Sequence, residues 1–272
     1  MLNVIKVGKQ IEPYSEEKIL HSIKRAGIPE KIHNDVLKHV NSKVYDNIPS
    51  SEIYGHVTEF LGASDYPYSR SRYSLKQAIM DLGPTGYPFE DFISEILNSH
   101  GYNTEVRVNL MGKCVSHEVD IVAKKNERSI LIEAKFHNSV GTRTDVHVPM
   151  YTKSRYEDIK DKYNLNESWI ITNTKATTDA IAFAECVGMT IISWSYPEKG
   201  SLRELIESAG LHPITILSTL LPQHKLNLLK RHIIRCKSIH ENPSILEPLG
   251  ISVEEKKKVL DEIEFVCKGE HR

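Results

Sequence analysis

The sequence has few cysteines, no long apolar run and almost no net charge, and each shortage excludes a class of protein. Its four cysteines stand far apart without a Cys-x-x-Cys pair, which argues against a zinc module or a disulfide framework and predicts buried free thiols. No apolar stretch approaches the roughly 20 residues that span a bilayer. The opening residues, MLNVIKVGKQ, lack the apolar core of a signal peptide. We therefore expect a cytoplasmic protein without a membrane partner.

The charge balance and one missing motif limit how the protein would meet nucleic acids and nucleotides. The net charge is −1 over 272 residues, so a surface that binds nucleic acid has to be local. The phosphate-binding loop Gly-x-x-x-x-Gly-Lys-Ser/Thr does not occur. A bound nucleotide would thus be a regulatory ligand rather than a fuel. The apolar share of 40% suffices for a real core, and the length predicts two or three domains.

Helix breakers and changes of pattern divide the chain into three segments. Residues 1–83 contain a short strand and then helices, and a stretch rich in Gly and Pro follows them. Residues 86–197 alternate strands with helices, and residues 198–272 are helical throughout. The predicted fold class is therefore a multi-domain α/β protein: a helical first domain with short β-strands, a mixed α/β core and an all-α carboxy-terminal domain.

Three charged residues interrupt apolar strands in the middle segment. Glu133 and Lys135 are two positions apart on one strand, so their side chains share a face. Asp120 interrupts the preceding strand, and a turn near Asn126 joins the two strands into a hairpin. This pairing brings Asp120 and Glu133 to the same edge of a sheet.

Two carboxylates at one edge repel each other, and a divalent cation relieves that repulsion. Mg²⁺ (or Mn²⁺) prefers oxygen ligands and keeps several waters, so Asp120 and Glu133 are the predicted metal ligands. The cation would activate a water for phosphodiester hydrolysis, and Lys135 would orient that water or stabilise the developing charge. Glu90, on the preceding helix, is either an outer carboxylate of this site or a solvated helix residue. A surface hairpin with an ordinary ion pair is the alternative for the other three, and the apolar context argues against it.

Four stretches follow one another in the middle segment: FEDFISEILNSHGY, HEVDIVA, ILIEAKF and WIITNTKATTDAIAFAECVGMTIISW. In this order they resemble the Mrr-like restriction endonucleases of the PD-(D/E)-x-K nuclease superfamily, over residues 86–197. The resemblance implies an active site of four residues: Glu90, Asp120, Glu133 and Lys135. Ala134 stands where the family commonly has Cys or Val. Where members often carry a Gln on the next helix, this chain has His147 and Tyr151.

Three stretches of the first segment form a second set of motifs: VIKVGKQIEPYSEEKI, KVYDNIPSSEIY and YPYSRSRYSLKQAI. They resemble the ATP cone, a nucleotide-binding regulatory module of ribonucleotide reductases and their repressors, over residues 1–83. The resemblance implies that ATP or dATP binds through four residues: Val4, Lys6, Lys18 and Ile19. Val7 replaces the usual second basic residue and Gly8 comes one place early, which implies weakened or rearranged phosphate contacts. Two solvated lysines would be the ordinary alternative.

The carboxy-terminal segment carries the most basic stretch of the chain, predicted as one helix over residues 223–237. Its lysines and arginines could contact a nucleic-acid backbone. The following sequence, PSILEPLGISVEEKKKVLDEI, looks like a helix-hairpin-helix with Gly250 in the turn. A small packing or oligomerisation domain is the equal alternative.

These features predict a metal-dependent deoxyribonuclease that ATP or dATP regulates allosterically. Its expected partners are DNA, an adenine nucleotide and further copies of the chain, as a dimer or a tetramer. Defence against foreign DNA follows from the resemblance alone. Two alternatives stay open: a nucleotide-sensing DNA-binding regulator with an inactive nuclease fold, and an RNA-directed nuclease. The intact set of Asp120, Glu133 and Lys135 argues against the first.

Overall fold

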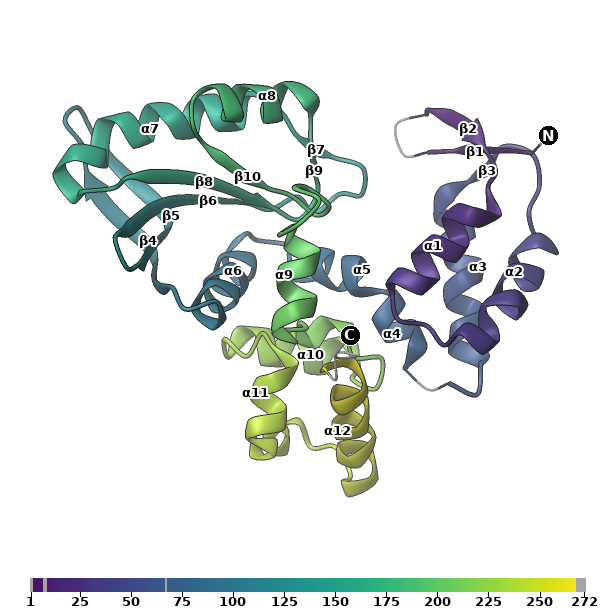
Figure 1. Cartoon of the computed structure of the whole chain (residues 1–272). Helices are drawn as coiled ribbons and strands as arrows, with labels where there is room; N and C mark the ends of the chain where they lie inside the picture. Colours follow the sequence, from purple (N-terminus) through teal and green to yellow (C-terminus); the bar gives the residue numbers. More distant parts are fainter. Residues whose placement is uncertain (1, 7–8, 67, 268–272) are drawn as a thin grey trace.

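The computed structural model describes residues 2–6, 9–66 and 68–267, so Val7 and Gly8, which were expected near the nucleotide phosphates, lie outside the described residues. Figure 1 shows the first segment beside the large sheet of the middle segment, with the last helices packed below both. The predicted fold class, a multi-domain α/β protein, is confirmed.

The first segment combines a small sheet with helices. Its strands are β1 (Asn3–Ile5), β2 (Ile11–Pro13) and β3 (Ile48–Pro49), in the order β2-β1-β3. Its helices are α1 (Glu16–Arg25), η1 (Glu30–Ile32), α2 (His33–Asn41), α3 (Ser50–Ala63), α4 (Ser69–Tyr73) and α5 (Leu75–Met80). Ser15 caps α1, because its hydroxyl accepts a hydrogen bond from the backbone N of Lys18 at 3.4 Å. Ile23, Val36 and Val57 join these helices in a core of their own.

The pattern SRSRYSLKQAIMDLG predicts one helix over residues 69–83, but the structure has two short helices that meet at Ser74. The backbone N of Ser74 donates to the carbonyls of both Arg70 and Ser71, which marks a tightened turn. Its hydroxyl accepts a hydrogen bond from Tyr54 at 3.0 Å. A serine whose side chain bonds elsewhere competes with regular helix geometry, which sequence periodicity does not reveal.

The middle segment is a five-stranded mixed sheet in the order β10-β8-β6-β5-β4. Its elements are α6 (Tyr87–Ser99), β4 (Asn103–Met111), β5 (Ser116–Lys125), β6 (Arg128–Lys135), β7 (Arg143–Thr144), α7 (His147–Tyr163), β8 (Glu167–Thr172), β9 (Lys175–Ala176), α8 (Thr178–Cys186) and β10 (Thr190–Ile192). Strands β4, β5 and β6 pair antiparallel, and β6, β8 and β10 pair parallel. The expected hairpin is present, with Asn126 in its turn at φ +53°.

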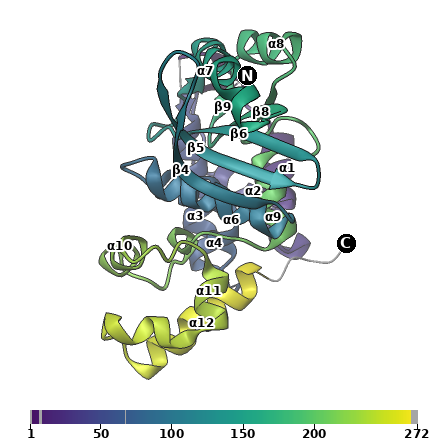
Figure 2. The same ribbon diagram turned by 90° about the vertical axis from the view of Figure 1, so that its left-hand side faces the viewer.

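Helices cover both faces of this sheet. Ile130, Ile132 and Ala134 of β6 join the core that contains α6. Leu131, between them in sequence, packs in a different cluster with Ile159 of α7. Figure 2 shows the same arrangement, with α7 and α8 on one side of the sheet and α6 and α9 on the other. The strand alternation of β6 therefore directs Glu133 and Lys135 to the α7 face.

The carboxy-terminal segment consists of short helices: α9 (Leu202–Ala209), η2 (Ile214–Ile216), α10 (Pro222–Lys230), α11 (Cys236–Glu241), η3 (Pro243–Leu249) and α12 (Val253–Cys267). The prediction of one helix over residues 223–237 is wrong. The chain leaves helical geometry at residues 231–235 because its backbone pairs elsewhere: the N of Ile214 donates to the carbonyl of Ile234 at 2.7 Å. The sequence pattern also predicts helices at 215–220 and 244–249, where the structure has 3₁₀ turns over Ile214–Ile216 and Pro243–Leu249.

This break divides the basic stretch of the segment. Arg235 pairs with Glu95 of α6 at 2.6 Å, and Lys225 donates to the carbonyl of Thr215 at 2.9 Å. The stretch is therefore not one continuous basic helix face. Gly250 turns the chain at φ +67°, and Ser252 caps α12 because its hydroxyl accepts a hydrogen bond from the backbone N of Glu255 at 3.2 Å.

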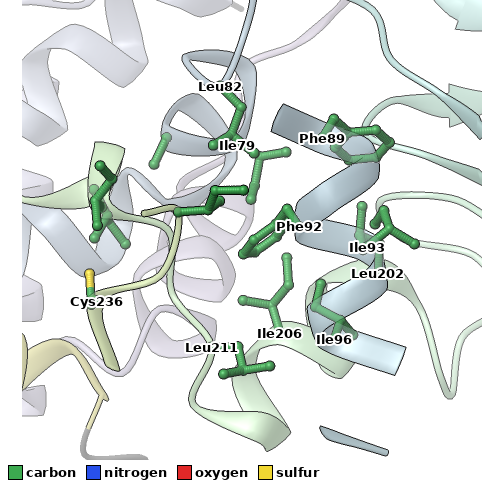
Figure 3. Packing of buried hydrophobic residues seen from close by; sticks show 14 of the residues in the cluster. Ile79, Leu82, Phe89, Phe92, Ile93, Ile96, Leu202, Ile206, Leu211 and Cys236 are labelled. Atoms are coloured by element: carbon green, nitrogen blue, oxygen red, sulfur yellow. The ribbon is translucent and has the colours of Figure 1, made fainter. Parts of the chain in front are cut away.

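One hydrophobic core continues across the predicted boundaries near residues 83–86 and 197–198. Figure 3 shows Ile79, Phe92 and Ile206 side by side, from α5, α6 and α9 respectively. The carboxy-terminal segment therefore packs directly on the core of the middle segment. The boundaries themselves stay predictions.

The four cysteines are unpaired, as expected, but only Cys236 is fully buried. Cys114 and Cys186 are exposed, so the prediction of buried thiols is wrong for them. Cys114 lies in the turn before β5, and Cys186 ends α8. None of the helices in the described ranges has both the length and the apolar character that a bilayer crossing requires.

Candidate active site

Strands β5 and β6 separate at the place where Asp120 and Glu133 stand, and we call this place the strand fork. The paired register extends as far as Ile121 opposite Ile132, and the two carboxylates follow directly. Asp120 Oδ2 accepts a hydrogen bond from the backbone N of Ala134 at 2.8 Å. The carboxylate accepts the hydrogen bond that a carbonyl of a neighbouring strand would otherwise accept. It is thereby fixed beside the peptide bond that follows Glu133. The predicted meeting of Asp120 with Glu133 at one edge therefore agrees with the geometry.

The neighbouring strand β4 bends at Arg107, which has φ +54°, a strained value for a residue with a side chain. Val106 packs toward the α6 face of the sheet and Val108 toward the α7 face, although alternate residues of a regular strand share one face. The Arg107 guanidinium pairs with Glu90 at 3.2 Å and with Asp91 at 2.7 Å. The bend thus ties α6 to the sheet next to the strand fork.

Glu90 is not a solvated helix residue, because it is only 8% exposed. Burial raises the pKa of its carboxyl, and the nearby charge of Asp120 raises the pKa further, while Arg107 opposes both effects. The alternative of a solvated Glu90 is therefore wrong. Its carboxylate is close enough to Asp120 for the charge of Asp120 to raise its pKa.

Burial also raises the pKa of both carboxyls at the strand fork. For Glu133 the second cause is the charge of Asp120, and Arg155 opposes it. For Asp120 the hydrogen bond from Ala134 is the largest opposing effect. The positive charge of Lys135 also lowers both pKa values, which places its ammonium within electrostatic reach of the pair.

Arg155 of α7 is a site residue that the sequence patterns did not reveal. Its Nη1 donates to Glu133 Oε2 at 2.5 Å, and the residue is 7% exposed. The two residues considered for this helix lie further out: the His147 side chain is 87% exposed, and Tyr151 is 63% exposed with its ring 5.4 Å from the Arg155 guanidinium. Positions 147, 151 and 155 follow one helix face, so continuing that stripe by one turn would have found Arg155.

The donor set at the strand fork fits a hydrated divalent cation. In the described part of the chain, no group of three or more His, Cys, Asp and Glu side chains is arranged to hold a metal ion. The strand fork offers instead two largely buried carboxylates, and the charge of Asp120 raises the pKa of Glu133 beyond the effect of burial. Mg²⁺ typically binds through one or two carboxylates and keeps several waters, whereas structural zinc requires four protein ligands.

A second candidate site is a cavity of about 150 Å³ between β1, β2 and α1. All four residues expected to contact nucleotide line it: Val4, Lys6, Lys18 and Ile19. Glu12 of β2 pairs with Lys6 Nζ at 2.7 Å and with Lys18 Nζ at 2.9 Å. These hydrogen bonds from the two lysines hold the pKa of Glu12 below its usual range. The lysines therefore converge on one anion, as they would on a phosphate.

Comparison with known proteins finds three family matches in this chain. Residues 2–78 match the ATP cone domain, residues 84–197 match a restriction endonuclease domain of the Mrr type, and residues 212–267 match the AF1548-like carboxy-terminal domain. The predicted order of an ATP cone followed by an Mrr-like nuclease is confirmed.

Two relatives share the greater part of the chain. An uncharacterized protein from Archaeoglobus fulgidus is 35% identical over 176 residues, which make up 64% of this chain and 99% of that protein. The crystal structure of the protein of unknown function AF1548 matches with a TM-score of 0.58 and 33% identity, over 68% of this chain and 100% of that one.

Proposed function

Because the chain belongs to the AF1548-like proteins and joins an ATP cone to a restriction endonuclease domain of the Mrr type, we propose that it is a divalent-metal-dependent deoxyribonuclease regulated by ATP or dATP. The observation that carries the proposal is the strand fork. There the carboxylate of Asp120 is anchored on the peptide that follows Glu133, and Lys135 stands two residues along the same strand.

Each residue of the strand fork has a definable task in phosphodiester hydrolysis. Asp120 and Glu133 would hold Mg²⁺ or Mn²⁺, which when bound supplies an activated water and offsets phosphate charge. Arg155 orients Glu133 through its hydrogen bond. Lys135 would orient the attacking water or stabilise charge on the phosphate oxygens. Glu90, held by Arg107, adds a further carboxylate behind Asp120.

The complete set of charged groups favours an active enzyme over a DNA-binding regulator with an inactive fold. A protein that had lost the chemistry would gain nothing from keeping two mutually repelling, largely buried carboxylates, because replacing them with neutral groups removes a cost to folding. Assembly into a dimer or tetramer and a role in defence stay predictions.

Cleavage should depend on both the metal and Lys135. Plasmid DNA and a labelled RNA are incubated with Mg²⁺, with and without ATP or dATP. We expect the native chain to cut DNA, and Lys135→Ala to lower the rate by about 10² or more, because one stabiliser of transition-state charge is lost. The matched control is Lys124→Ala, on the exposed surface of β5. Equal cutting by all three proteins would refute the assignment, and cutting of RNA alone would identify an RNA-directed nuclease.

Glu12→Gln should strengthen nucleotide binding. Glu12 occupies both lysines that a phosphate would use, so a bound nucleotide has to displace it. We expect affinity to rise about three- to tenfold, the equivalent of one or two exposed ion pairs. Calorimetric titration with ATP, dATP and ADP measures this, with Glu17→Gln on the exposed side of α1 as the control. Unchanged or weaker binding would show that Glu12 does not compete with the ligand.

A further inference from the structure

A cavity of about 640 Å³ lies between the ATP cone and the nuclease domain. The charged residues that line it come from both sides: Lys6, Glu12 and Lys18 of the cone, Lys76 of α5, and Arg143 and Lys175 of the nuclease domain. Arg143 and Lys175 are partners in the two-stranded sheet of β7 and β9. Figure 1 shows that this small sheet is on the side of the nuclease domain that faces β1 and β2.

The size of the two cavities indicates where a nucleotide fits. Sites for small organic ligands usually enclose about 300–1,000 Å³. The cone cavity alone, at about 150 Å³, is smaller than that range, whereas the interdomain cavity falls within it. The two cavities share the lining residues Lys6, Glu12, Lys18, Ser50 and Tyr54. A nucleotide that enters the cone cavity therefore extends into the space between the domains.

The charge of the interdomain cavity favours the binding of an anion. Five cations and a single carboxylate line it. In the part of the chain that the structure describes, Lys76, Arg143 and Lys175 pair with no carboxylate. Burial lowers the pKa of Lys76, and the nearby charge of Lys175 lowers it further. Cations that repel one another across a partly enclosed space are stabilised by a polyanion such as a chain of phosphates.

We propose that the nuclease domain forms part of the nucleotide site: the phosphates lie between the domains and contact Arg143 and Lys175 together with Lys6 and Lys18. This proposal rests on the proposed binding of nucleotide to the cone. It adds to that site a wall that the nuclease domain supplies, consisting of Arg143 and Lys175. The ligand would then directly contact the domain that it regulates.

Short contacts connect this wall to the strand fork. Thr144, which follows Arg143, is completely buried, and its hydroxyl donates to Thr172 at 3.0 Å. Thr172 stands opposite Lys135 in the register of β8 and β6. The hydroxyl of Thr144 is also 3.0 Å from Nε2 of His137, two residues beyond Lys135. A phosphate that moves or fixes Arg143 would therefore act on the end of the strand that carries Lys135.

The test measures nucleotide binding by the full chain. ATP and dATP are titrated into the native protein and into Arg143→Gln, Lys175→Gln and the exposed control Lys124→Gln, after circular dichroism has verified folding. We expect Arg143→Gln and Lys175→Gln each to weaken binding about five- to tenfold, the loss of one charge-assisted phosphate contact, and Lys124→Gln to leave it unchanged. Native binding that neither pocket variant weakens would overturn the nuclease wall. No binding by the native chain would refute the proposed regulation itself.

A second measurement separates direct contact from a structural role. An amine-reactive acetylating reagent labels lysines at rates that mass spectrometry follows. Bound ATP should slow the labelling of Lys175 at least fivefold and leave Lys124 unaffected, because Lys175 lines the cavity and Lys124 does not. Equal labelling of Lys175 with and without saturating ATP would contradict the proposal.

Discussion

Asp120→Asn should abolish DNA cleavage and, at the same time, make the metal-free protein more stable. Asparagine keeps an oxygen that accepts the hydrogen bond from Ala134 N, so the strand fork retains its shape. The charge that would bind the metal is removed, and we expect the cleavage rate to fall by about 10³-fold. Removal of the same buried charge should raise the melting temperature at neutral pH by roughly 2–4 °C, the equivalent of about 1 kcal/mol.

The gain in stability has a defined pH dependence. The pKa of Asp120 is higher in the folded chain than in the unfolded one, with burial as the largest cause. Between these two pKa values the folded chain binds more protons, so its stability falls as pH rises through that window. The penalty is complete above the folded pKa and absent below the unfolded pKa. The stability difference between Asp120→Asn and the native chain should therefore be largest at neutral pH and disappear in acid.

Protons that bind the carboxylates of Asp120 and Glu133 compete with the metal. Because ligating carboxylates have to be deprotonated, the affinity of the native chain for Mg²⁺ should fall as pH is lowered through the raised pKa values of Asp120 and Glu133. Thermal unfolding without metal and cleavage with Mg²⁺ are measured over a pH series, with Glu105→Gln as an exposed carboxylate control on the neighbouring strand β4. An asparagine variant that cuts DNA at close to the native rate, or that is less stable than the native chain at neutral pH, would contradict the metal-ligand role.

The site residues that sequence could predict are those placed by local geometry. Alternation along β6 and a two-strand hairpin suffice to place Glu133, Lys135 and Asp120 together. The helix face of His147 and Tyr151 points to position 155, but the contact of Arg155 with Glu133 depends on how α7 crosses the sheet. The left-handed conformation of Arg107 is likewise stabilised by tertiary ion pairs, and no local pattern announces it.

The errors in the helices have a common physical cause. Periodicity reports a preference for helix, but a backbone that finds hydrogen-bond partners elsewhere leaves the helix. At Ile234 and Cys236 the backbone partners are Ile214 and His212, some twenty positions earlier in the chain. The resemblance to an ATP cone similarly located Lys6 and Lys18, whereas their shared partner Glu12 and the facing wall of the nuclease domain appear only in three dimensions.

Glu262 joins the first and the carboxy-terminal segments, and its loss should be far more costly than the loss of a surface carboxylate. The residue is on α12 and is completely buried. Its Oε1 accepts hydrogen bonds from the hydroxyl of Ser71 and from the backbone N and hydroxyl of Ser218, at 2.5, 2.7 and 2.8 Å. Its Oε2 accepts from the N and hydroxyl of Thr219, at 2.9 and 2.6 Å. Five donors thus stabilise one carboxylate and tie α4 of the first segment to the carboxy-terminal helices.

Glu262→Ala should lower the free energy of unfolding by about 3–5 kcal/mol, because it leaves several buried donors without an acceptor and opens a cavity. Glu262→Gln keeps the volume but turns an NH₂ group toward donors, so we expect a smaller loss of about 2 kcal/mol. Asp261→Asn, at the exposed neighbouring position, should change stability by less than about 0.5 kcal/mol. Urea unfolding at neutral pH measures all three.

The same substitution should loosen the ATP cone from the rest of the chain. Ser71 is on α4, and the neighbouring Arg72 donates a hydrogen bond to the carbonyl of Phe265 at 2.7 Å. Helix α12 is therefore a direct attachment for the cone. Without Glu262, limited proteolysis should cut between residues 63 and 86 under conditions that leave the Asp261→Asn protein intact. A Glu262→Ala protein that unfolds within about 1 kcal/mol of the native chain would mean that water replaces the five hydrogen bonds at little cost, and the attachment would then depend on the apolar core around Ile79 instead.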